Sequence, residues 1–264
     1  MSLELDFLGA IRRESSRFTE CLTRVSPTAP VPSCPFWTAA DLLWHLAEVQ
    51  LFWGAIVRER LDNPEAAEAT KPPRPAEYNE LQALARRATA ELLETLASTP
   101  EPTKLWTWAT DHTAGFVLRR QAHEALIHRL DAELTVGEVT SFDPELAADG
   151  VDEALRVMYG TAPEWGNLTP DGPPGRLLAT DVRMAWQVGF GRFTGTSPDT
   201  GNVYDEDMLT MPSTTDIPAE YTLAGTAADL DRWLWGRSDL SALDTSGDTV
   251  ALERFAAIVA TGMQ

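Results

Sequence analysis

The stretch TAADLLWHLAEVQLFWGAIVRERL, residues 38–61, decides the fold of the first half of the chain. It opens with a capping-box pattern, Thr38-Ala39-Ala40-Asp41, in which a hydroxyl and a carboxylate can bond the first amides of a helix. Apolar side chains then recur at steps of three and four, at Leu42, Leu46, Val49, Trp53 and Ile56. We therefore predict a helix that runs to about Leu61 and buries one side.

Three more segments are predicted to be helical, the first two from their apolar periodicity and the third from its strong helix-forming residues. The first, residues 3–24, ends at a proline-rich connector from Pro27 to Pro35, and the second, residues 78–96, is closed by Thr99-Pro100. The third, residues 114–134, lacks proline and stops at Gly137. Four long helices joined by loops predict a helical bundle over residues 1–140.

The sequence pattern changes after residue 140. Residues 144–160 predict one more helix, and residues 165–175 (WGNLTPDGPPG) predict a loop. The alternation over residues 176–193 and the segment 220–225 favour strands. Helical periodicity returns over residues 226–236 and 248–260, with no internal repeat. We expect an α+β domain over residues 141–264, in which the long segments 161–175 and 195–219 are insertions specific to this chain.

Composition and charge exclude several classes of partner. Forty acidic and 21 basic side chains give a net charge of −19, which repels nucleic acid and anionic membrane surfaces. No stretch approaches eighteen consecutive apolar residues, so we expect a cytoplasmic protein, either a monomer or a small homo-oligomer. Cys21 and Cys34 form no C-x-x-C pair and are expected to be reduced. Cys34 is either a packing residue or a reactive thiol.

His45 lies on or beside the apolar stripe of the 38–61 helix, three residues after Leu42 and four before Val49. A buried imidazole needs a polar partner. That partner is either an ordinary hydrogen-bonding group in the core or a bound ligand, and this residue alone leaves both interpretations open.

Glu124 and His128 are four residues apart, so on a helix they lie about 40° apart and share one face. Two ligands placed in this way can bind one ion. The alternative is a surface pair that stabilises the helix slightly. The spacing alone does not decide between them.

The other two histidines do not extend this pair. His123 points about 140° away from His128, and the sequence HEALIH is one residue too long for the H-E-x-x-H zinc-protease motif, which excludes that class. His112, beside Asp111, is predicted to lie in a loop, where it could line the entrance of a site.

A four-helix bundle can bring His45 of one helix to Glu124 and His128 of another. Two imidazoles and one carboxylate suit zinc and leave a fourth position for water or substrate, as in catalytic zinc sites. Iron, manganese and nickel accept the same ligands. The sequence therefore predicts a divalent metal site, with zinc as the first choice.

Four segments in this order resemble the DinB/YfiT-like metal-binding bundles and, within them, the mycothiol-dependent maleylpyruvate isomerase family. They are FWTAADLLWHLAEVQLFW (36–53), RRQAHEALIHRLDAEL (119–134), LAADGVDEAL (146–155) and GTAADLDRWLWGR (225–237). The resemblance covers most of the chain. It implies an up-down four-helix bundle followed by a smaller α+β domain of SCP2-like fold, with the metal held by His45, Glu124 and His128.

The resemblance also implies an activity that uses mycothiol, a low-molecular-weight, sugar-linked cysteine thiol. A metal with an open position lowers the pKa of a bound thiol, and thiolate is the nucleophile. Thiolate would add to the double bond of maleylpyruvate, allow rotation and leave, or it would stay joined to a small electrophile as in S-transfer. We slightly favour the transferase. The rival hypothesis is a non-catalytic metal- or ligand-binding bundle with a closed site.

An acidic substrate needs a cationic group to bind it. The resemblance indicates Arg237, with Arg183 as the second choice, although either could be an ordinary surface arginine. Arg129 and Asp131 flank the ligands and are candidates to orient them or to bridge helices. Four tryptophans are expected in the core rather than in a pocket wall: Trp44, Trp53, Trp106 and Trp108.

Overall fold

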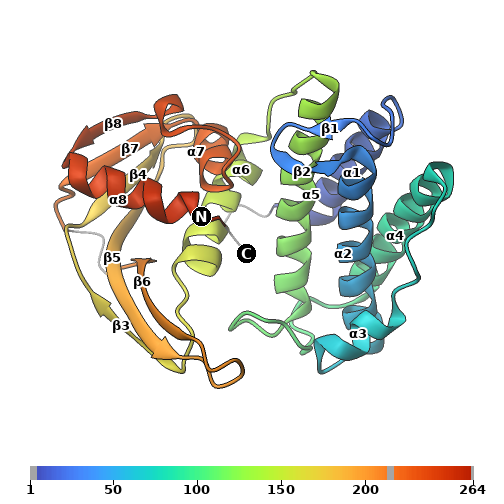
Figure 1. The fold of residues 1–264 in the computed structure, drawn as a ribbon, viewed down its shortest axis with the longest axis horizontal. Helices are drawn as coiled ribbons and strands as arrows, with labels where there is room; N and C mark the ends of the chain where they lie inside the picture. Colours follow the sequence, from blue (N-terminus) through green and yellow to red (C-terminus); the bar gives the residue numbers. More distant parts are fainter. Residues whose placement is uncertain (1–4, 213–216, 263–264) are drawn as a thin grey trace. The chain divides into compact units, whose positions relative to one another are not determined.

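The computed structural model describes residues 5–212 and 217–262. The chain divides into two compact units, Met1–Ser141 and Phe142–Gln264. The first contains long helices and one small hairpin, and the second combines helices with a mixed sheet (Figure 1). The predicted α+β class, with an N-terminal helical bundle and a C-terminal α+β domain, is confirmed.

The four predicted long helices of the first unit are present. They are α1 (Phe7–Leu22), α2 (Ala39–Glu59), α4 (Tyr78–Ser98) and α5 (Ala114–Val136). The predicted capping box forms, because Thr38 and Asp41 exchange hydrogen bonds at the start of α2. Gly137 ends α5 with φ of 73°, which a glycine adopts without strain. Leu3, where the first helix was predicted to begin, lies outside the described residues.

The helices pack with their apolar stripes inward, α1 mainly on α5 and α2 mainly on α4. One buried cluster joins all four, with Phe18 from α1, Leu42 and Leu46 from α2, Leu81 from α4 and Ala132 from α5. Burial of such side chains stabilises a fold by about 1.5–3 kcal/mol each. The apolar core therefore makes a large contribution to holding the helices at a fixed spacing.

Two elements of the first unit were not predicted. The proline-rich connector forms a short hairpin of β1 (Pro30–Val31) and β2 (Cys34–Thr38). A further helix, α3 (Pro64–Thr70), starts at Asn63, whose side chain accepts from the Ala66 amide. Both are too short to give a recognisable apolar period.

The second unit begins with the predicted helix, α6 (Pro144–Glu153), which continues as a π-helical segment, η1 (Ala154–Tyr159). The strands of its mixed sheet run in the order β3-β5-β4-β7-β8, and β6 also pairs with β5. The strands are β3 (Gly166–Pro170), β4 (Gly175–Ala179), β5 (Met184–Thr196), β6 (Val203–Thr210), β7 (Tyr221–Gly225) and β8 (Asp244–Gly247). The remaining helices are α7 (Ala227–Leu234), the short η2 (Leu240–Ala242) and α8 (Thr249–Ala260).

Two predictions in this unit were wrong in detail. The predicted loop at 165–175 contains β3, which is held by antiparallel pairing with β5 rather than by its own propensity. The predicted strand at 176–193 is two strands, β4 and β5, separated by a turn in which Arg183 has φ of 55°. Antiparallel pairing with β5 decides both cases, because a local sequence pattern does not report which strands pair. The 195–219 region, expected to be an insertion, contains β6.

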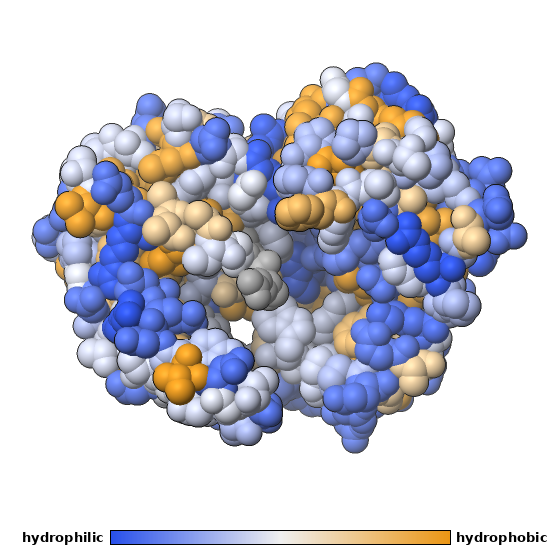
Figure 2. Space-filling view, in the orientation of Figure 1, coloured by the Kyte–Doolittle hydropathy of each residue, from blue (hydrophilic) through white to orange (hydrophobic). Residues whose placement is uncertain are grey.

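No helix in the described parts of the chain is long and apolar enough to cross a membrane. Figure 2 shows hydrophilic and hydrophobic residues mixed over the visible face of each unit.

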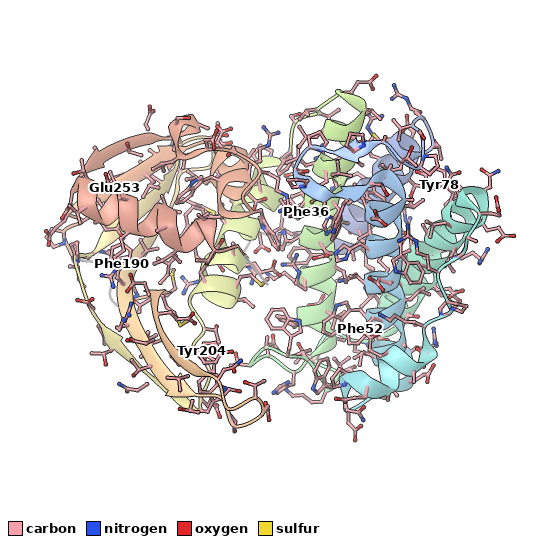
Figure 3. All side chains as sticks on the ribbon, in the orientation of Figure 1. Phe36, Phe52, Tyr78, Phe190, Tyr204 and Glu253 are labelled. Carbon is pink, nitrogen blue, oxygen red and sulfur yellow. The ribbon has the colours of Figure 1, made fainter. Side chains whose placement is uncertain are left out.

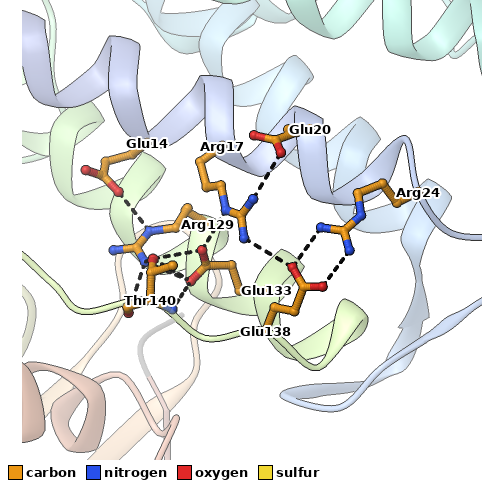
Figure 4. A network of polar contacts seen from close by, with 8 residues as sticks. All are labelled: Glu14, Arg17, Glu20, Arg24, Arg129, Glu133, Glu138 and Thr140. Carbon is orange, nitrogen blue, oxygen red and sulfur yellow. Dashed lines mark hydrogen bonds and ion pairs between the residues drawn. The ribbon is translucent and has the colours of Figure 1, made fainter.

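A network of arginine and glutamate side chains ties α1 to α5 (Figure 4). Arg129 donates to Glu14 and Glu133, and Arg17 donates to Glu133, all at 2.8 Å. Glu133 is fully buried and also accepts from the Thr140 amide. Farther along, Arg24 pairs with Glu138. Residues later in the α1 segment pair with residues later in the α5 segment, so α1 and α5 run parallel.

Replacing Glu133 with alanine should lower the free energy of unfolding by about 3–5 kcal/mol, because Arg129 and Arg17 lose a buried counter-charge. Urea denaturation measures the loss. Arg24→Ala is the control, since both Arg24 and Glu138 are exposed and the midpoint should hardly change. Equal effects of the two variants would contradict the structural role given to Glu133.

Candidate metal centre

The structure brings together the three predicted ligands. One atom each of His45, Glu124 and His128 lies within 4.8 Å of the other two. Oε1 of Glu124 is 3.3 Å from Nε2 of His45 and 3.1 Å from Nε2 of His128. Two imidazole nitrogens thus share one carboxylate oxygen, and a divalent cation fits this donor set.

The positions of the three side chains follow from the helices that hold them. Glu124 and His128 stack on one face of α5, as their spacing predicts. His45 lies beside the buried stripe of α2, and its side chain remains 29% exposed. It is therefore accessible and is not a fully buried core histidine. Trp106 of the loop before α5 donates its amide to Leu61, just after α2, so α2 and α5 run antiparallel.

Asp131 fixes the orientation of the His128 ring. Its Oδ2 lies 2.9 Å from Nδ1 of His128, and its Oδ1 accepts from the Ser33 hydroxyl of the hairpin at 2.5 Å. Asp131 is fully buried. With Nδ1 bonded to a carboxylate, Nε2 is the nitrogen that His128 presents to Glu124. Histidine ligands of protein metals are commonly held by such a carboxylate.

Arg120, one turn before Glu124, contacts the other oxygen of the same carboxylate. Its Nη2 donates to Oε2 of Glu124 at 3.1 Å, and its side chain is only 4% exposed. Oε1 remains directed at the two histidines. Arg120 therefore helps to orient the Glu124 carboxylate so that Oε1 is the oxygen available to a metal ion.

The charges of this cluster shift two pKa values in opposite directions. Burial raises the pKa of Glu124, but hydrogen bonds with His128 and His45 outweigh it and hold that pKa well below its usual value. Burial lowers the pKa of His128, but hydrogen bonds with Asp131 and Glu124 raise it to about 9. The carboxylates thus stabilise a positive charge at the position of Nε2, where a metal ion would replace the proton.

The hairpin supplies an aromatic wall that sequence reasoning missed. The Trp37 ring centroid lies 4.8 Å from that of His45 and 6.3 Å from that of His128. The neighbouring Phe36 is 98% exposed on β2, whereas Phe52 lies farther along α2 (Figure 3).

Of the tryptophans expected in the core, Trp53 is buried and Trp108 is 48% exposed.

The other candidate residues are not members of the three-residue cluster. His123 is buried and packs edge-on against Phe7 of α1, and His112 lies in the loop before α5, as predicted. Arg129 bridges α5 to α1. Arg237 belongs to the second unit, after α7, where its Nη1 donates to the Trp235 carbonyl oxygen at 2.7 Å. Its predicted role stays a prediction.

Arg120 could have been found from its i, i+4 spacing to Glu124, the same signal that paired Glu124 with His128. Trp37 and Ser33 could not, because their approach to the site depends on the fold of a proline-rich connector with no regular period.

The first unit is a helical bundle with a His, Glu, His cluster between two of its helices, and the second is an α+β domain. A family model described as the mycothiol maleylpyruvate isomerase N-terminal domain matches residues 8–133, and the model of the C-terminal domain of these enzymes matches residues 145–254. The chain therefore belongs to the mycothiol-dependent maleylpyruvate isomerase family.

Two solved structures have a similar fold. One is a mycothiol-dependent maleylpyruvate isomerase, 17% identical, with a TM-score of 0.56. The other is a histidine-to-alanine mutant of an enzyme with that name, 16% identical, with a TM-score of 0.55. Each comparison covers 92% of this chain and 93% of the other chain. At this identity the likeness shows the fold alone. The comparison with curated proteins found no match.

His45→Ala and His128→Ala should each abolish metal binding, because two remaining ligands bind an ion weakly. The helices should stay folded, since the apolar core is untouched. Elemental analysis of the purified variants, with circular dichroism as the folding check, measures both effects. His112→Ala, in an exposed loop, should keep its metal. Stoichiometric metal in either ligand variant would contradict the assignment.

Asp131→Asn should weaken metal affinity by roughly 10- to 100-fold, because the amide no longer fixes the His128 ring with a full negative charge. Competition with a metal chelator measures the affinity. Asp62→Asn makes the same change at an exposed position after α2 and should have no effect. An unchanged affinity in Asp131→Asn would show that Asp131 does not support the site.

Proposed function

We propose that this protein is a metal-dependent enzyme that uses mycothiol to act on a small, electrophilic substrate. The observation that carries the proposal is the convergence of His45, Glu124 and His128 on one point, in a chain of the mycothiol-dependent maleylpyruvate isomerase family. Three protein ligands are the usual number in catalytic zinc sites, whereas structural sites have four. This count favours an enzyme over a non-catalytic binding protein.

The residues that would hold the ion are His45, Glu124 and His128, with zinc as the expected metal. A bound zinc ion with an open position supplies thiolate at neutral pH by lowering the pKa of a coordinated thiol. The protein's own residues do the rest. Asp131 keeps His128 oriented, Arg120 keeps Oε2 of Glu124 engaged, and Trp37 shields one side of the two imidazoles.

The reaction that fits a thiolate and an activated double bond is conjugate addition. A thiolate held there would supply the electron pair for a carbon–sulfur bond, and the alkene electron pair would move onto the conjugated carbonyl oxygen. After rotation about the new single bond, return of that pair from the oxygen would re-form the alkene, release the thiolate and give the geometric isomer. If the adduct takes up a proton and is released, the same first step is an S-transfer. The family favours the isomerase, and the fate of the adduct distinguishes the two activities.

Arg237 is the proposed anchor for a substrate carboxylate. It carries a permanent charge in a strongly acidic chain, and its Nη1 is oriented by the Trp235 carbonyl oxygen. We assign metal and thiol chemistry to residues 1–140 and substrate recognition to residues 141–264.

Purified zinc-loaded protein should convert maleylpyruvate only when mycothiol is present. Mass spectrometry then separates an isomer of unchanged mass from a product heavier by one mycothiol. A protein with full metal that gives neither product, from maleylpyruvate or from a panel of electrophiles, would support the non-catalytic alternative and contradict the proposal.

Arg237→Ala should lower kcat/KM for an anionic substrate by about 10- to 100-fold, the usual effect of losing a hydrogen bond to a charged group, without loss of metal. The matched control is Arg183→Asn, because Arg183 is exposed and asparagine tolerates its positive φ. A larger loss in Arg183→Asn than in Arg237→Ala would reverse the assignment.

A further inference from the structure

The side chain of Gln121 is buried without a hydrogen-bond partner. The residue is 1% exposed, and neither Nε2 nor Oε1 bonds any of the described residues. A primary amide offers two donors and an acceptor. Leaving such groups unpaired in a protein interior is costly and uncommon, so the pairing groups are expected to come from something that binds there.

Gln121 lies on the same stripe of α5 as the metal ligands. It precedes Glu124 by three residues and His128 by seven, which places it about 60° and 20° from them around the helix axis. The bond between His45 and Glu124 shows that this stripe faces α2. Gln121 therefore lies between α2 and α5, about one helical turn, or roughly 4.5 Å along the axis, from Glu124.

We propose that the Gln121 amide hydrogen-bonds an amide group close to the sulfur of the thiol that binds at the metal centre. In a cysteine derivative, the amide atoms on Cα lie on the order of 4 Å from the sulfur by standard bond lengths. The spacing of Gln121 and Glu124 along the helix axis is similar to this distance between the amide and the sulfur. This inference rests on the proposed function, because it requires a thiol at the metal.

The hydrogen-bonding groups of Gln121 favour an amide ligand over a carboxylate or a simple alkyl thiol. An amide carbonyl accepts from Nε2 while an amide N–H donates to Oε1, so both atoms of Gln121 gain a partner. A substrate carboxylate would satisfy Nε2 but would place negative charge near Oε1. A simple alkyl thiol would leave both unpaired. Gln121 thus distinguishes an acylated cysteine from other thiols.

The test is a comparison of two thiols on cobalt-substituted protein, in which sulfur binding to the metal gives a charge-transfer absorption band. N-acetylcysteine methylamide carries amides near its sulfur, and 1-propanethiol carries none. Wild type should bind the amide thiol about tenfold more tightly or better, as one or two hydrogen bonds predict. In Gln121→Leu this preference should disappear, with binding of 1-propanethiol retained.

Gln50→Leu is the matched control. Gln50 is equally buried, but its amide bonds Ser15 and Thr89. Because Gln50→Leu removes these hydrogen bonds, the variant should have a lower thermal unfolding midpoint and an unchanged thiol preference. Gln121→Leu should not lower the midpoint, because no protein hydrogen bond is lost.

An unchanged thiol preference in Gln121→Leu, or a loss of stability as large as that of Gln50→Leu, would overturn the inference while leaving the proposed function intact. The absence of a sulfur band with either thiol in wild type would overturn both, because it would show that no thiol reaches the metal.

Discussion

The sharing of one carboxylate oxygen of Glu124 between His45 and His128 is the contact on which the site depends. His45 comes from a helix 79 residues earlier in the chain, so the contact exists only while α2 and α5 stay at one separation. The apolar core of the bundle maintains that separation. The buried network around Glu133 holds α5 against α1 and so limits rotation or sliding of the helix that carries two of the three ligands.

The electrostatic surroundings of this contact favour a cation. Asp131 and Glu124 flank His128 with two carboxylates, and Arg120 donates to Oε2 of Glu124, the oxygen that is not shared by the histidines. The raised pKa of His128 and the lowered pKa of Glu124 have one cause, which is that positive charge is favoured at the point between them. The same carboxylates would stabilise a divalent ion at that point, which carries two positive charges where a proton carries one. The net charge of −19 favours the approach of a cation and makes a specific arginine necessary for an anionic substrate.

The sequence predicted the bundle and the three ligands because both depend on the helical period. The stripe from Leu42 to Ile56 and the spacing of Glu124 and His128 are local properties of helices, and the structure keeps them. Sequence reasoning missed Trp37, Ser33 and β3, which owe their places to pairing or packing with distant residues. Gln121 was also missed, since a polar residue on a helix shows its unusual burial only when the neighbouring helix is in place. The role of Arg237 stays a prediction because it depends on a bound substrate.

X-ray absorption at the zinc edge, with and without mycothiol, shows whether the thiol binds the metal. We expect two imidazole nitrogens and carboxylate or water oxygens at about 2.0–2.2 Å in the resting protein, and one sulfur at about 2.3 Å when the thiol is added. A first shell that gains no sulfur, or one that holds four protein ligands before and after, would contradict this expectation.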